Sequence, residues 1–172
     1  MKKSKNNPIF LNLQKDFLIV FLLASAILFV KLIISYNVYG TNDITYWIGF
    51  ADVIQKFGTF KIYSLIEIYN HPPLISWILK LMRIIEVKTQ VSFPFLFRLM
   101  PILADYASIF VIWKLLEKYK IKNKILISLI CLLTPINILI SGFQGKIAAV
   151  FIFLVLLAIY FAESNNVIFS GL

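Results

Sequence analysis

The sequence predicts an all-α integral membrane protein, and three observations support this fold class. The 172 residues are 60% hydrophobic and 15% charged, with a mean hydropathy of +0.88, which is too apolar for an ordinary soluble domain. Several apolar runs are close to the roughly 20 residues that cross a bilayer as a helix. Lysines cluster beside these runs, as they do at the cytoplasmic ends of membrane spans.

Composition excludes several classes of site. The single cysteine, Cys131, rules out a disulfide framework and a cysteine-built zinc site, and the single histidine, His71, argues against a histidine-built metal site. Carboxylates are the remaining candidate ligands. No metal site is predicted, and a divalent cation bound by carboxylates stays an open alternative. The net charge of +9 lies largely in two lysine clusters beside apolar segments, which indicates membrane topology and predicts no nucleic-acid partner.

Four apolar runs are predicted to span the membrane. The first, residues 17–34, follows four lysines and precedes no small-residue cleavage pattern, so it is predicted to be an uncleaved signal anchor with a cytoplasmic N-terminus. Lys31 lies near its outer end, where the ammonium is expected to snorkel toward the headgroups. The other predicted spans are residues 94–116, 125–140 and 146–161.

The first two spans are separated by an outer loop, residues 35–93, that contains shorter apolar segments. Residues 72–85 place Ser76, Lys80 and Arg83 at positions i, i+4 and i+7, which forms one polar stripe on an otherwise apolar helix. This pattern predicts a helix that lies flat in the membrane interface.

Residues 44–57 show the same design, and Asp52 and Lys56 in this segment are expected to form a surface pair at i, i+4. The basic loop at residues 117–124 supports the interfacial interpretation. The positive-inside rule places this loop in the cytoplasm, with the N-terminus, only if residues 72–85 do not span the membrane.

Asp105 lies in the middle of the second predicted span. A charge there costs about 2.5 to 3.5 kcal/mol on insertion scales. We therefore expect Asp105 to have a structural or functional role that offsets this cost. Arg98 lies about 10.5 Å away along the helix axis and cannot pair with Asp105. Two interpretations stay open for Asp105: an anchor that bonds a neighbouring helix, or a direct chemical role.

Two places in the outer loop carry further candidate residues. Asp43 follows Gly40-Thr41-Asn42 just before a predicted helix, where either Asn42 or Asp43 could act as an N-cap. In Tyr69-Asn70-His71-Pro72-Pro73-Leu74, the two prolines restrict the backbone and hold Asn70 and His71 at the membrane surface. A lone histidine is more often structural than catalytic, so its role stays open.

The candidate motifs follow one another along the chain in a recognisable order. They are Gly40-Thr41-Asn42-Asp43-Ile44-Thr45-Tyr46, Gly58 with Ile62-Tyr63, the Tyr69 to Leu74 corner, Arg98 with Pro101 and Ala104-Asp105, the basic loop, and Thr134-Pro135 before Ser141-Gly142-Phe143-Gln144-Gly145. This ordered set resembles the start of a GT-C fold membrane glycosyltransferase. Such enzymes transfer a sugar, here expected to be a hexose of the mannose type, from a polyprenyl-phosphate donor to a lipid, protein or glycan acceptor on the outer or luminal face.

The resemblance implies roles for particular residues. It implies that Asp43 is the general base that accepts the proton of the acceptor hydroxyl. Donor-phosphate and substrate binding is expected from five residues: Arg98, Lys80, Arg83, Asn70 and His71. Of these, Lys80 and Arg83 are assigned from their helical stripe and not from a family motif. The apolar faces of the flat helices are expected to seat the polyprenyl tail.

Two departures from the family keep other functions open. Many relatives carry an acidic pair where this chain has Lys146-Ile147-Ala148, and family members usually contain several hundred residues, so the chain is expected to be an N-terminal portion. The alternatives are a non-catalytic membrane scaffold or degenerate relative, and a small transporter component that uses Asp105 and Arg98 as pathway charges. The expected location is a microbial plasma membrane, with the endoplasmic reticulum as the alternative.

Overall fold

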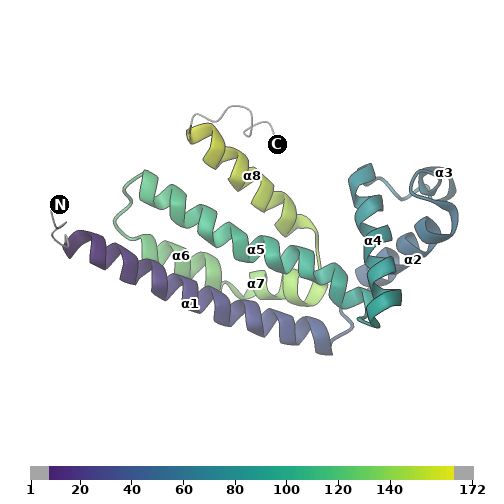
Figure 1. Ribbon diagram of the computed structural model, residues 1–172, viewed down its shortest axis with the longest axis horizontal. Helices are drawn as coiled ribbons and strands as arrows, with labels where there is room; N and C mark the ends of the chain where they lie inside the picture. The colour runs from purple at the N-terminus through teal and green to yellow at the C-terminus, as the bar shows by residue number, and fades with distance from the viewer. Residues whose placement is uncertain (1–7, 165–172) are drawn as a thin grey trace, which may run out of the picture.

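The protein is a bundle of long helices with a smaller helical layer at one end (Figure 1). The computed structural model describes residues 8–164, and side chains from residue 15 onward; these residues contain helices and no strand. The long helices are α1 (Pro8–Asn37), α5 (Phe93–Lys118), α6 (Lys124–Leu133) and α8 (Ala148–Glu163), with the short α7 (Pro135–Asn137) and the π-helix η1 (Ile138–Gln144) between α6 and α8. The layer at the end consists of α2 (Asn42–Phe57), α3 (Ile62–Leu65) and α4 (Pro73–Thr89).

Two of the described helices are long and apolar enough to cross a membrane, Lys15–Asn37 and Phe93–Lys118. A third span forms if Lys124–Leu133 and Pro135–Gln144, which meet at a bend of 49°, count as one. The bend coincides with Pro135, which lacks the N–H that would continue the helix. The fold class is therefore confirmed as an all-α membrane protein. The fourth predicted span corresponds to α8, which is apolar but shorter, so the number four stays a prediction.

A buried ion pair joins the two longest helices. Lys31 Nζ on α1 lies 2.7 Å from Asp105 Oδ2 on α5, and the two side chains are 4% and 12% exposed. The neighbouring helix that bonds Asp105 is therefore α1. The expectation that Lys31 snorkels to the headgroups is wrong, because a carboxylate within reach compensates the ammonium inside the bundle. Nearer the N-terminal end of α1, Trp113 and Ile109 of α5 pack against Val20 and Ala24 of α1.

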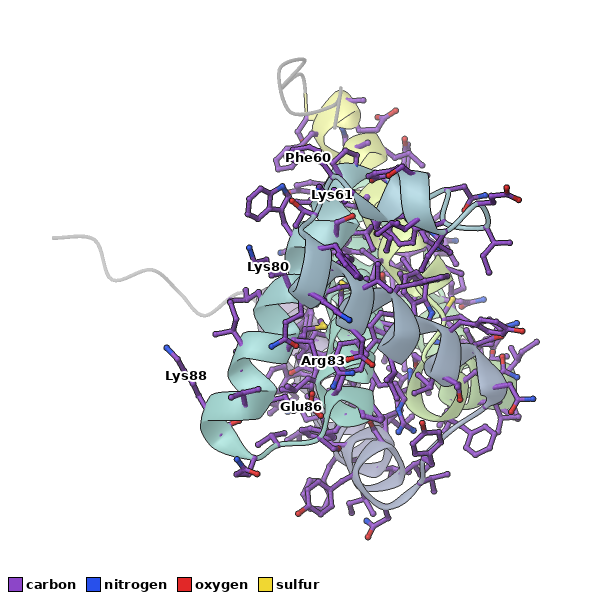
Figure 2. The ribbon with its side chains drawn as sticks, turned by 90° about the vertical axis from the view of Figure 1, so that its right-hand side faces the viewer. Phe60, Lys61, Lys80, Arg83, Glu86 and Lys88 are labelled. Atoms are coloured by element: carbon purple, nitrogen blue, oxygen red, sulfur yellow. The ribbon has the colours of Figure 1, made fainter. Side chains whose placement is uncertain are left out.

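The small layer has its own apolar core, in which Ile44 and Ile54 of α2 meet Leu79 of α4 and Phe97 of α5. Helix α4 turns two of its three stripe residues, Ser76 and Arg83, into this layer, whereas Lys80 points to the outer side (Figure 2). The first stripe residue, Ser76, is fully buried and shares a hydrogen bond of 2.8 Å with the Tyr69 hydroxyl.

Arg83, the last stripe residue, lies between α4 and α2 (Figure 2), where it pairs with Asp52 of α2 and with Glu86 of α4. The expected pair of Asp52 with Lys56 is therefore wrong, because the guanidinium from α4 takes the carboxylate. Lys56 instead lies 5.1 Å from the Phe57 ring.

The outward side of α4 is apolar. Leu74, Trp77, Leu81 and Val87 are each more than half exposed. An exposed apolar stripe at this spacing is typical of a helix that lies on a membrane, although the interfacial position of α2 and α4 stays a prediction.

Arg98 joins three segments at the end of the bundle nearest the small layer. Its guanidinium donates hydrogen bonds to the carbonyls of Pro94 in α5, of Val38 and Tyr39 after α1, and of Phe143 in η1. These bonds use four of the five N–H donors of an arginine. The side chain is 1% exposed, so the bonds take the place of hydration.

Two glycines allow the segments to approach this guanidinium. A Cβ at Gly145 would lie 2.5 Å from Arg98 Cγ, and one at Gly40 would lie 2.9 Å from the carbonyl oxygen of Phe143. Both residues also have positive φ angles, +70° at Gly145 and +98° at Gly40, which other residues rarely adopt. The junction of Arg98, Gly40 and Gly145 therefore requires glycine at both positions.

The buried pair predicts a non-additive pair of substitutions. Asp105→Leu leaves the Lys31 ammonium buried without its partner, which is expected to lower the free energy of unfolding by about 3 to 5 kcal/mol. The double variant Lys31→Leu/Asp105→Leu removes both charges and is expected to recover most of that loss. Thermal unfolding in detergent, followed by circular dichroism, measures both. A double variant as unstable as the single one would contradict the pairing.

The junction predicts that Gly145→Ala lowers the free energy of unfolding by more than about 1 kcal/mol, because the added methyl meets Arg98 at a positive φ. The matched control is Gly49→Ala in α2, where a Cβ meets no atom within 4 Å. Alanine has the higher helix propensity, so the control is expected to be neutral or slightly stabilising. The same unfolding assay compares the two, and equal stability of both variants would argue against the tight junction.

Candidate active site

A cleft of about 320 Å³ lies beside the start of α2. It brings together the first turns of α2, the corner that precedes α4, and the turn that leads into α8. The lining residues are Asp43, Tyr46, Trp47, Phe50, Ile68, His71, Lys146 and Ile147. A cavity of this size falls at the lower end of the range of small-molecule sites. We call it the Asp43 cleft.

Asp43 lies in the first turn of α2, and its side chain is 50% exposed. Helix α2 begins after Thr41, which occupies the N-cap position, and no side chain caps it. The alternative that Asn42 or Asp43 caps the helix is therefore not what the structure shows. Asp43 instead has its carboxylate in the cleft.

Lys146 is the cation nearest this carboxylate among the described residues. Its Nζ atom lies 4.0 Å from Asp43 Oδ2, and its side chain is 51% exposed. The sequence identified this position only as a departure from the acidic pair of many relatives. The sequence did contain a signal for this placement, because Lys146 directly follows Gly145. The turn at this glycine directs the chain back toward α2.

Aromatic rings form one wall of the cleft. The Trp47 ring centroid lies 4.6 Å from that of His71 and 4.8 Å from that of Phe97, and Tyr69 lies 5.2 Å from His71. Trp47 was not among the candidate residues selected from the sequence. Its place in the cleft results from the packing of the corner against α2.

The corner before α4 holds His71 as the two prolines predicted. Pro72 has an extended backbone and Pro73 begins α4, while the Tyr63 hydroxyl donates a hydrogen bond of 2.7 Å to the carbonyl of His71. Burial among the rings lowers the pKa of His71 below its usual value, because desolvation disfavours the imidazolium. His71 is therefore neutral at pH 7. Asn70 is exposed beside it.

The five residues expected to bind the donor do not share one site. His71 lines the Asp43 cleft, whereas Arg83 and Arg98 line a second cleft of about 400 Å³ between α1, α4 and α5. In that second cleft both guanidinium groups are occupied, by carboxylates at Arg83 and by carbonyls at Arg98. Lys80 lines neither of the two clefts and lies on the outer side of α4 (Figure 2), with its Nζ 5.7 Å from the Trp77 ring.

Within residues 8–164 no group of three or more histidine, cysteine, aspartate or glutamate side chains lies close enough to hold a metal ion. The residues that line the Asp43 cleft supply one carboxylate, one ammonium, a neutral imidazole and aromatic faces. Such a set can accept a proton, bind an anion and pack against the apolar faces of a small polar ligand.

Comparison with known proteins gives one match. The profile of the dolichyl-phosphate-mannose-protein mannosyltransferase family matches residues 70–165, which begin at the His71 corner and end beyond α8. No curated protein and no solved structure matches the chain. The match covers more than half of the chain and agrees with the resemblance to GT-C glycosyltransferases. The chain therefore belongs to the dolichyl-phosphate-mannose-protein mannosyltransferase family.

Proposed function

We propose that this chain forms the substrate-binding part of a membrane glycosyltransferase that moves a mannose-type hexose from a polyprenyl-phosphate donor to a lipid, protein or glycan acceptor. The family match supports the class of enzyme. The observation that carries the proposal further is the ionisable carboxylate of Asp43 in a cleft with an aromatic wall. Aromatic rings offer flat apolar surfaces on which the C–H faces of a sugar can pack.

In the proposed reaction, the acceptor hydroxyl oxygen attacks the anomeric carbon of the donor sugar. The bond from that carbon to the phosphate oxygen breaks, and polyprenyl phosphate leaves with the bonding electrons. Asp43 accepts the hydroxyl proton as general base, which makes the oxygen more nucleophilic as the bond forms. The exposed position of Asp43 lets an acceptor reach the carboxylate.

The other candidate residues have supporting roles in this proposal. Neutral His71, with exposed Asn70 beside it, offers hydrogen bonds to sugar hydroxyls. Arg98 holds the segments around the cleft together, and Arg83 joins α4 to α2. Lys80 lies on the outer side of α4, where a lipid headgroup is the nearest anion to expect.

The positions of the lysines support one orientation of the chain in the membrane. Asp16 of α1 lines one cleft together with Lys122 and with Lys124 at the start of α6, so the first half of α1 and the basic loop share one end of the bundle. The layer with α2 and α4 lies at the opposite end (Figure 1). The positive-inside rule then supports a cytoplasmic basic end and an Asp43 cleft on the outer or luminal face. We propose a microbial plasma membrane, with the endoplasmic reticulum as the alternative.

The contacts of Asp105 favour a structural role over the transporter alternative. Asp105 is paired with Lys31, and the cavity beside the pair has about 10 Å³, which is close to the minimum for one water molecule. A pathway for a solute needs a wider cavity. The scaffold alternative differs from the proposal in one respect, because a scaffold does not need the Asp43 carboxylate.

The proposal predicts that Asp43→Asn lowers sugar transfer by at least about 100-fold, because the amide cannot accept the proton. The measurement is transfer of radiolabelled mannose from a polyprenyl-phosphate donor by membranes that contain the protein at its natural length. The matched control is Glu67→Gln, an exposed carboxylate that does not line the Asp43 cleft and is expected to keep full activity.

Equal protein levels on immunoblots are needed for all three proteins. Unchanged turnover in the Asp43 variant would remove the general base from the proposal. Transfer that is absent even in the unaltered protein would favour the scaffold alternative.

A further inference from the structure

The Asp43 cleft contains one cation whose charge faces solvent. Lys146 Nζ is 4.0 Å from Asp43 Oδ2, longer than a direct hydrogen bond, and both side chains are about half exposed, at 51% and 50%. The contact is therefore weak enough to be rearranged by a ligand. The ammonium has three N–H donors, which is enough for Asp43 and for a second anion at the same time.

The two arginines near this end of the bundle already have partners. Arg98 has four of its five N–H donors bonded to backbone carbonyls. Arg83 is held between Asp52 and Glu86, two carboxylates against one guanidinium, so its surroundings repel a further anion. Both arginines line the second cleft and not the one that contains Asp43.

We propose that Lys146 binds the phosphate of a polyprenyl-phosphate ligand in the Asp43 cleft, where the Trp47 ring supports the attached sugar. This inference rests on the proposed function and names the anion-binding group of that site. A lysine binds phosphate as a point charge through ammonium hydrogen bonds. The phosphate gains negative charge as the sugar leaves, so the same lysine stabilises the leaving group.

The position of Lys146 beside Asp43 also meets an electrostatic requirement. A carboxylate and a phosphate in one small cleft repel each other, and the repulsion lowers the affinity for the donor. An ammonium beside the carboxylate reduces this repulsion. The lysine thus suits a site that takes both a donor phosphate and an acceptor hydroxyl.

The packing around Lys146 explains why it reaches this site. Gly145, against which Arg98 packs, turns the chain with φ +70°. Ile147 is buried in the core of the small layer with Ile44. Lys146 lies between these two fixed residues, and its backbone N–H donates a hydrogen bond of 3.1 Å to the carbonyl of Ile140. The backbone of Lys146 is thus held in place, while the ammonium end of its side chain can move.

The test is equilibrium binding of radiolabelled farnesyl phosphate to the protein in phosphatidylcholine nanodiscs. Lys146→Gln is expected to weaken binding about tenfold, the loss typical of one hydrogen bond to a charged group, whereas Lys146→Arg is expected to stay within about threefold. Lys56→Gln is the matched control, because Lys56 is an exposed lysine on α2 that does not line the cleft. Circular dichroism verifies that each variant is folded.

Two further ligands separate the phosphate from the isoprenoid and from free phosphate. Farnesol lacks the phosphate, so its binding is expected to be equal in the unaltered protein and in Lys146→Gln. Inorganic phosphate is expected to compete only weakly, because it lacks the apolar tail. Farnesyl phosphate binding is also expected to weaken as salt increases, since the lysine is exposed.

Three results would overturn the inference: no binding of farnesyl phosphate by the unaltered protein, equal binding by Lys146→Gln, or an equal loss of farnesol binding in that variant. Inorganic phosphate that competes as well as farnesyl phosphate would show a site for free phosphate instead. The binding assay needs no turnover, so it separates this inference from the proposed function. Normal transfer by Asp43→Asn together with weak binding by Lys146→Gln would remove the general base and leave the phosphate site standing.

Discussion

The guanidinium of Arg98 is the interaction on which the outer end of this protein depends. It bonds carbonyls from three segments, after α1, in α5 and in η1, and the most distant of these carbonyls, Val38 and Phe143, are 105 residues apart in the sequence. Buried carbonyls at the ends of helices need donors, and a single arginine supplies them here without opening the core to water.

The junction also determines the shape of the Asp43 cleft. Gly145 packs against Arg98 on one side, and a Cβ there would lie 3.1 Å from Ile44 Cδ1 on the other. Ile44 directly follows Asp43, and Lys146 directly follows Gly145. The close packing of the glycine against the isoleucine is therefore what brings the ammonium near the carboxylate. Arg98, which the sequence analysis assigned to phosphate binding, thus supports the cleft from outside it.

Charged side chains are arranged differently inside the bundle and in the small layer. Inside the bundle, Lys31 and Asp105 compensate each other between α1 and α5, and Gly142 of η1 packs so closely that a Cβ there would lie 3.4 Å from the Lys31 side chain. In the small layer, Ser76 and Arg83 of α4 are turned inward, with Arg83 paired to Asp52. Leu74, Trp77, Leu81 and Val87 of the same helix face out. Both arrangements suit a lipid environment, where polar groups find partners within the protein and apolar groups face outward.

The sequence by itself determined the fold class and the family. Long apolar runs give long helices wherever the surroundings are hydrocarbon, and the prolines at 72 and 73 set the start of α4, because these effects are local. The pairing partners could not be read in the same way. Lys31 with Asp105, Arg83 with Asp52 and Lys146 with Asp43 are separated by 74, 31 and 103 residues. Sequence spacing identifies only neighbours on one helix, so Asp52 was assigned to Lys56, and the family resemblance assigned Arg98 to a ligand. Only the tertiary structure decided which charges meet, because burial makes each of them take the partner that packing brings within reach.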